Sequence, residues 1–227
     1  MSSVGVRPTG SVLGIDVGWS PRKKTTCICL LAWDISTARL TFRLVGADGV
    51  ERRTAVRDLA RECGELAAVA IDGPLTSGLR SIRHYRSAEA LLSRGTLQRR
   101  GKPGQTSSPT GLQLHAHATS LAQLVIEELS IALSSHPQSI HERCVVEAFP
   151  NMFMAAIVPE GSLTVLKRDA SDRYWDTLVR DSDRLIRLIE HLLPGRRLDY
   201  ELRECIDHEH RAGVICALTA LAVSACD

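Results

Sequence analysis

The stretch SVLGIDVG, from Ser11 to Gly18, decides the fold. Its apolar and β-branched residues predict a buried strand, and its closing glycine predicts a tight turn. Two more strands are predicted directly after it, at Thr25 to Trp33 and at Arg39 to Val45, the latter with alternating apolar and polar residues. Three consecutive strands of this kind predict a meander that begins at Ser11.

Helices and strands alternate in the rest of the chain. A helix is predicted from Thr54 to Cys63, and buried strands are predicted from Leu66 to Ile71 and from Arg143 to Phe149. A polar, glycine-rich loop is expected from Ser93 to Gly111. Further helices are expected at Leu79 to Leu92, Leu112 to Leu133, Asn151 to Val158, Asp172 to Leu193 and His208 to Cys226.

This order predicts an α/β fold with a mixed five-stranded sheet flanked by helices. Right-handed crossovers place the strand from Ser11 in the centre, the strand from Leu66 beside it and the strand from Arg143 beyond that one. No internal repeat or linker interrupts the chain. Residues 1–227 are therefore interpreted as one domain, with a basic helix–loop insertion around residues 79–111.

The composition is that of an ordinary globular protein, with 44% hydrophobic and 24% charged residues. Met1 to Gly10 has no apolar run typical of a signal peptide, and no run in the chain reaches the roughly 18 apolar residues of a membrane helix. The seven cysteines, among them Cys27 and Cys29, mostly lie in apolar runs, which favours core thiols over disulfides or a zinc site. We therefore expect a soluble cytoplasmic protein without a membrane partner.

The positive charge is concentrated in one segment, although the net charge is only +2. The segment from Arg80 to Lys102 carries seven basic residues against one acid, Glu89. This excess favours contact with phosphate groups of a nucleic acid, DNA or RNA, although a solvated helix face beside a loop has the same composition. The residues expected to bind nucleic acid are Arg80, Arg83, Arg99, Arg100 and Lys102.

Acidic residues follow the apolar runs of three predicted strands. Asp16, Asp72 and Glu147 each lie near a strand end, and Asp207 and Glu209 lie at the start of the last helix. Because ligands bind at the carboxyl ends of such strands, we expect these acids to converge on one cleft. Carboxylates that close repel each other and need a cation, and hard oxygen ligands favour Mg²⁺ or Mn²⁺. Such ions activate water for phosphodiester hydrolysis.

Each of these acids also has a purely structural interpretation. Asp16 and Asp72 are suited to accepting hydrogen bonds from turn amides, and Glu147 to pairing with an arginine. Asp207 is a good N-cap for the last helix. His208 and His210, two residues apart on a helix, lie on different faces, which disfavours a zinc site.

The sequence resembles the domain-of-unknown-function 429 family, whose members are regarded as predicted ribonuclease-H-like nucleases. The similar motifs are GIDVG at Gly14 to Gly18, AIDGPL at Ala70 to Leu75, RGKPGQTSSPTG at Arg100 to Gly111, VVEAFP at Val145 to Pro150 and DHEHRAGVICALTA at Asp207 to Ala220. The resemblance implies a ribonuclease-H-like fold with Asp16, Asp72, Glu147 and an acid near the last helix in the site. This sequence differs from the pattern of such enzymes at one point. They often have an Asp-Ala pair leading into the last helix, whereas this chain reads Arg211-Ala212-Gly213. The fourth ligand is then Asp207 or Glu209, or is missing.

The leading hypothesis is a metal-dependent nuclease or a nuclease-like nucleic-acid-binding protein. An actin-like or sugar-kinase-like phosphotransferase shares the GIDVG strand, but such proteins normally duplicate the domain, and this chain has no repeat. A non-catalytic interaction domain with a degenerate site is the third hypothesis. The absent Asp near Ala212 favours it, and the retained acids oppose it.

Overall fold

A computed structural model describes residues 7–62, 64–75, 87–95, 106–134, 143–159, 162 and 170–225. Its strands form one mixed sheet in the order β5-β6-β4-β1-β2-β3-β7. The strands are β1 (Gly10–Asp16), β2 (Thr26–Trp33), β3 (Thr37–Val45), β4 (Leu66–Asp72), β5 (Ala132–Leu133), β6 (Cys144–Ala148) and β7 (Arg197–Leu198).

The predicted α/β class and the predicted order of the five long strands are both confirmed. β1 is central and pairs antiparallel with β2 and parallel with β4, and β4 pairs parallel with β6. The sheet is larger than the predicted five strands, because the two-residue strands β5 and β7 extend its two edges. Strands this short have too few residues to produce a periodic signal in the sequence.

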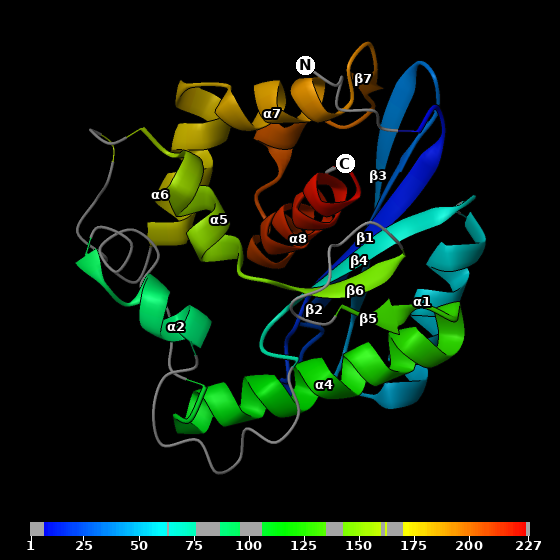
Figure 1. Cartoon of the computed structure of the whole chain (residues 1–227), viewed down its shortest axis with the longest axis vertical. Coiled ribbons are helices and arrows are strands. Elements are labelled where there is room, and N and C mark those ends of the chain that lie inside the picture. The colour runs from blue at the N-terminus through cyan, green and yellow to red at the C-terminus, as the bar shows by residue number, and fades with distance from the viewer. Residues whose placement is uncertain are drawn as a thin grey trace.

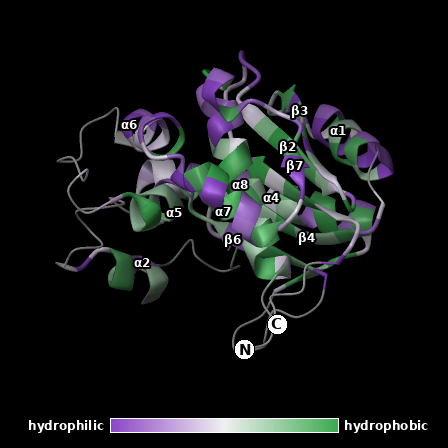
Figure 2. Cartoon of the chain, turned by 90° about the horizontal axis from the view of Figure 1, so that it is seen from above, coloured by the Kyte–Doolittle hydropathy of each residue, from purple (hydrophilic) through white to green (hydrophobic). Residues whose placement is uncertain are grey.

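Helices cover both faces of the sheet (Figure 1). They are α1 (Gly49–Glu62), α2 (Ser87–Leu92), α4 (Pro109–Leu129), α5 (Pro150–Ile157), α6 (Ala170–Asp176), α7 (Arg184–Leu192) and α8 (His208–Ser224). Residues of α5, α6, α7 and α8 form one buried core with one face of the strands, whereas residues of α1 and α4 form a second core with the other face. Figure 2 shows hydrophobic residues gathered in the middle of the molecule, where α8 lies over the strands.

The close packing of α8 on β1 depends on a glycine. A Cβ atom at Gly14 would lie 2.0 Å from the backbone nitrogen of Ala217, so no larger residue fits there without moving the helix. α8 is apolar around most of its circumference, as expected for a helix buried on several sides. This contact places the first turn of α8, with His208, above the carboxyl end of β1, as the cavity that His208 shares with Asp16 indicates.

Several predicted helices have different bounds in the structure, and α1, predicted from Thr54, already begins at Gly49. The helix predicted from Asp172 to Leu193 is divided, because a π-helical turn (Thr177–Asp181) follows α6 and Asp183 adopts a left-handed conformation with φ 51° before α7. The helix predicted from Leu112 begins instead at Pro109, inside the predicted loop, where Ser108 caps it by accepting a hydrogen bond from Gly111. It ends at Leu129, so that Ala132 and Leu133 join the sheet.

The cysteines that the structure describes are core residues, as predicted. Cys27, Cys29, Cys144, Cys205 and Cys216 are free and buried. None of the helices within the described ranges has both the length and the apolar character needed to cross a membrane.

Candidate functional site

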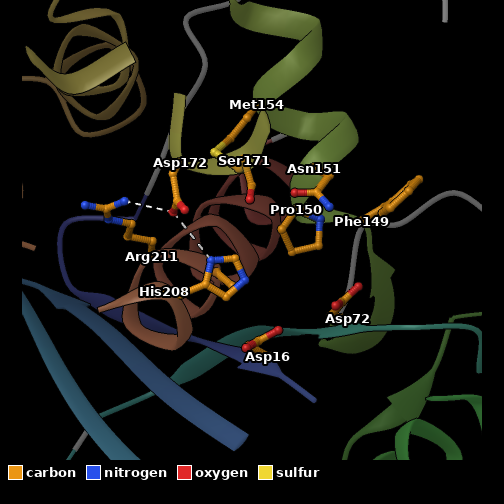
Figure 3. A pocket seen from close by; sticks show the side chains of 11 residues that line it. Asp16, Asp72, Phe149, Pro150, Asn151, Met154, Ser171, Asp172, His208 and Arg211 are labelled. Carbon is orange, nitrogen blue, oxygen red and sulfur yellow. Dashed lines mark hydrogen bonds and ion pairs between the residues drawn. The ribbon is translucent and has the colours of Figure 1, made fainter. Parts of the chain in front are cut away.

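Asp16 and Asp72 end two neighbouring parallel strands at the same level. Ile15 pairs with Ile71, so the two aspartates follow at the next position of each strand. Side chains alternate between the faces of a sheet, and Asp16 and Asp72 fall on the face covered by α8. Both line a cavity of about 80 Å³, into which their carboxylates point (Figure 3).

Burial and mutual repulsion make it costly to ionise these two carboxylates. Burial raises the pKa of Asp16 well above its usual range, and the charges of Asp72 and Glu209 raise it further. Burial raises the pKa of Asp72 to about 7. Near neutral pH a proton shared with these carboxylates therefore lowers the cost of keeping them together.

The opposite wall of this cavity consists of residues from α5, α6 and α8 (Figure 3). Asp172 of α6 accepts a hydrogen bond of 3.0 Å from Nη1 of Arg211, and Nδ1 of His208 lies 3.7 Å from the same carboxylate oxygen. Arg211 also donates from Nε to the carbonyl of Cys205 and lies over the ring of Trp175. Asp172 therefore fixes α6 against the first turn of α8.

Glu147 does not share the cavity of Asp16, contrary to the predicted convergence of all the acids. Along β6, Val146 and Ala148 pack under α8 and Val145 packs on the α4 side, so alternation places Glu147 on the α4 side. Its Oε1 accepts a hydrogen bond of 2.7 Å from the backbone nitrogen of Leu75 and so orders the chain after β4. The sequence analysis therefore predicted the correct edge of the sheet for Glu147 but not the face on which its side chain lies.

Gly73 allows the chain to turn toward α4 directly after β4. It has φ +125°, a conformation that favours glycine, and a Cβ atom there would approach Ala118 to 2.9 Å. The backbone can therefore leave β4 immediately after Asp72 and pass close to α4.

Asp207 caps α8, as its structural interpretation required. Its Oδ1 accepts hydrogen bonds from the backbone nitrogens of Glu209 and His210, and these bonds outweigh burial, so the pKa of Asp207 is lowered. The charge of Glu209 raises the pKa of Asp16, and the ring of His210 contacts the ring of Phe42 in a tilted arrangement with centroids 4.7 Å apart. Within α8, His208, Arg211 and Ala212 line the cavity.

The start of α8 contributes no carboxylate to the residues that line this cavity. Arg211 and Ala212, which stand where the family resemblance implies an Asp-Ala pair, both line the cavity with Asp16 and Asp72. Over the part of the chain that the structure describes, no group of three or more His, Cys, Asp or Glu side chains is arranged to hold a metal ion.

A single Mg²⁺ or Mn²⁺ fits the donors that are present. Asp16 and Asp72 offer hard oxygen atoms, and Asn151 and Ser171 add an amide and a hydroxyl to the same cavity. Mg²⁺ is commonly held by one or two carboxylates and keeps several waters, and a volume of about 80 Å³ accommodates a few waters. The cation would also relieve the repulsion that raises the two pKa values.

Several residues of the cavity were not found from the sequence. Asn151 follows the end of β6 in the motif Phe149-Pro150-Asn151, and its position just after a strand end was an available signal. Asp172 and Ser171 gave no such signal, because α6 reaches the cavity only through tertiary packing.

The residues predicted to bind nucleic acid, Arg80, Arg83, Arg99, Arg100 and Lys102, lie outside the described residues. Comparison of the chain with models of known protein families and with curated protein sequences found no match. The resemblance to the domain-of-unknown-function 429 family therefore rests on the five motifs quoted above and stays a prediction.

Proposed function

We propose that this protein is a metal-dependent nuclease in which Asp16 and Asp72 bind one Mg²⁺ or Mn²⁺ ion. The observation that carries the proposal is the pair of half-buried carboxylates at the ends of adjacent parallel strands, lining one cavity. The order β3-β2-β1-β4-β6, with β1 central and β2 antiparallel to it, supports a ribonuclease-H-like arrangement of the sheet.

Five of the residues that line the cavity have a defined task in this proposal. A bound divalent ion supplies a water of lowered pKa and stabilises charge on the phosphate. Asp16 and Asp72 hold the ion on the rigid edge of the sheet. Asp172 and Arg211 keep α6 and α8 in place, and His208 presents its ring to the cavity. The substrate phosphate is expected to approach from the open side of this cavity.

Nucleic acid is the proposed substrate because of the basic segment from Arg80 to Lys102. Its residues follow β4 and precede α4 in the chain, and both of these elements reach the carboxyl edge of the sheet. Arginine forms bidentate hydrogen bonds with phosphate, so a run of arginines is well suited to hold a nucleic-acid backbone.

The test is a cleavage screen with single-stranded and duplex DNA, RNA, a DNA–RNA hybrid and branched DNA, each with Mg²⁺, Mn²⁺ or EDTA. We expect cleavage with Mn²⁺ or Mg²⁺ that is lost in Asp16→Asn and in Asp72→Asn. Asp199→Asn, which changes an exposed carboxylate on the far edge of the sheet, is the matched control and should retain full activity.

Thermal unfolding tests the metal site separately from catalysis. Millimolar Mg²⁺ or Mn²⁺ should raise the unfolding temperature of the parent protein and of Asp199→Asn, because a ligand that binds only the folded state stabilises it. The same ions should have no effect on Asp16→Asn. An equal shift in all three proteins contradicts binding by the pair.

Ala212 favours a second candidate, a nucleic-acid-binding domain without catalysis. With Arg211-Ala212 in place of an Asp-Ala pair, a cation would have fewer protein ligands to fix it for hydrolysis. This candidate predicts metal-induced stabilisation and nucleic-acid binding without cleavage of any substrate in the screen.

A further inference from the structure

A second cavity lies next to the carboxylate pair, on the α4 side of the sheet edge. It has a volume of about 450 Å³, and Asp72, Phe149 and Asn151 line both cavities. Its other walls include Pro74, Leu114 of α4 and Glu147. The two cavities therefore adjoin each other along the carboxyl edge of β4 and β6.

The walls of the second cavity suit a flat, neutral ring better than an anion. Phe149, Leu114 and Pro74 provide apolar surface, whereas Glu147 and Glu89 provide carboxylates. A phosphate group would be repelled by these carboxylates, which already accept hydrogen bonds from Thr106 and Leu75, while a neutral heterocycle would not be repelled. The cavity is several times larger than the one at Asp16, which leaves room for a ring system.

Phe149 is placed to stack against such a ring. It lies in the short link between β6 and α5 and is partly buried, with part of its side chain packed on the core. Figure 3 shows its ring turned away from Asp16, on the far side of Asn151. Asn151 is exposed at the junction of the two cavities, where its amide can hydrogen-bond the edge of a base.

We propose that this second cavity binds a nucleobase next to the carboxylate pair Asp16 and Asp72, with the base stacked on Phe149. This inference rests on the proposed function and extends it, because it makes a single strand, or a base turned out of a duplex, the substrate. A base paired and stacked within a duplex cannot enter a side pocket without being unstacked. Aromatic stacking of this kind binds bases of different sequence.

The test compares two probes that differ only in their bases. A short fluorescent oligodeoxyadenylate and an abasic strand of the same length are titrated with the full-length protein in EDTA, which prevents metal-dependent cleavage, and anisotropy is measured. We expect the parent protein to bind the adenine-bearing strand about tenfold more tightly than the abasic strand. Phe149→Ala should lose this preference and leave the affinity for the abasic strand unchanged.

Matched variants separate stacking from folding. Phe149→Tyr keeps the ring and should keep the preference, while Phe149→Leu keeps apolar volume without a ring and should lose most of it. Phe153→Ala removes a partly buried phenylalanine of α5 that packs on the same core but does not line the cavity, so it should keep the preference.

The outcomes distinguish this inference from the proposed function. Equal binding of the two probes by the parent protein, or a full preference in Phe149→Leu, overturns the base pocket, even if cleavage in the metal-dependent screen succeeds. A preference that depends on the Phe149 ring, together with no cleavage in the screen, supports the pocket and leaves the binding domain without catalysis as the function.

Discussion

Asp16 and Asp72 lie side by side because the register of two parallel strands pairs Ile15 with Ile71 directly before them. Both aspartates fall on the face that α8 covers, and both line the same small cavity. The carboxylates are therefore brought together by the sheet itself, and burial under α8 makes them costly to ionise.

Replacing Asp72 by Asn should stabilise the metal-free protein, and the gain should depend on pH. The folded-state pKa of Asp72 is about 7, above the unfolded value of about 4, so the parent protein loses stability as pH rises through this window. We expect Asp72→Asn to unfold several degrees higher than the parent at about pH 8 in EDTA, and at the same temperature at about pH 4.

Asp34→Asn is the control of opposite sign. Backbone N–H groups of Ser36 and Thr37 lower the pKa of Asp34, so its contribution to stability is present at neutral pH and is lost as pH falls. Asp34→Asn should therefore be less stable than the parent at neutral pH.

The prediction for Asp72 is contradicted if Asp72→Asn is no more stable than the parent at about pH 8. That result would mean that ionising Asp16 and Asp72 does not destabilise the folded protein.

Ala212→Asp should strengthen metal binding. The new carboxylate would enter the cavity of Asp16 and Asp72, and each added charged ligand raises the affinity for a divalent cation. We expect the dissociation constant for Mn²⁺, measured by calorimetry, to fall by about tenfold or more.

Ala212→Asn introduces a side chain of nearly the same size as Asp but without its charge. It should change the affinity for Mn²⁺ far less than Ala212→Asp does. The double variant Asp16→Asn/Ala212→Asp should lose the gain, since the new carboxylate then lacks one of its two partners. An unchanged affinity in Ala212→Asp would show that this position does not face the bound ion.

Arg211→Ala should destabilise the protein by about 2–4 kcal/mol. The side chain of Arg211 is only 11% exposed, and its removal leaves Asp172 and the Cys205 carbonyl without their donor. Urea unfolding measures the loss. Arg43→Ala, which breaks an exposed ion pair with Glu62, should cost less than about 1 kcal/mol. Similar losses in the two variants would contradict a fixing role for Arg211.

Gly14→Ala should prevent the packing of α8 on β1. The added Cβ meets the backbone of Ala217, which has no flexible end to move aside. We expect a loss of more than about 4 kcal/mol, or an unfolded protein by circular dichroism. Gly49→Ala adds the same methyl group at the start of α1, where no atom lies within 4 Å, and should fold with nearly unchanged stability.

Replacing Arg99, Arg100 and Lys102 together with Ala should flatten the salt dependence of nucleic-acid binding. Each neutralised phosphate releases counterions and adds about 0.9 to the slope of log affinity against log salt. We expect the slope to fall by about two to three units at a nearly unchanged melting temperature. An unchanged slope would assign the basic segment to a solvated surface, and a large loss of stability would make its arginines structural.

The extent to which the site was predictable differs from residue to residue. Asp16 and Asp72 were found because each ends an apolar strand, and strands of like direction end at one edge. Glu147 satisfied the same pattern, yet it faces α4 and holds the Leu75 amide. A shift of one residue along a strand reverses the face, so predicting the edge alone does not predict which side chains meet.

The sequence by itself determined the α/β class, the order of the long strands and the central place of β1, because hydrophobic periodicity and chain connectivity are local properties. Only the tertiary structure decided that Asp172 and Arg211 close the cavity at Asp16, that Glu147 faces the other side of the sheet, and that Phe149 lines two cavities. These features depend on how α5, α6 and α8 pack on the sheet. Such packing joins residues that are distant in the chain, and no local pattern records it.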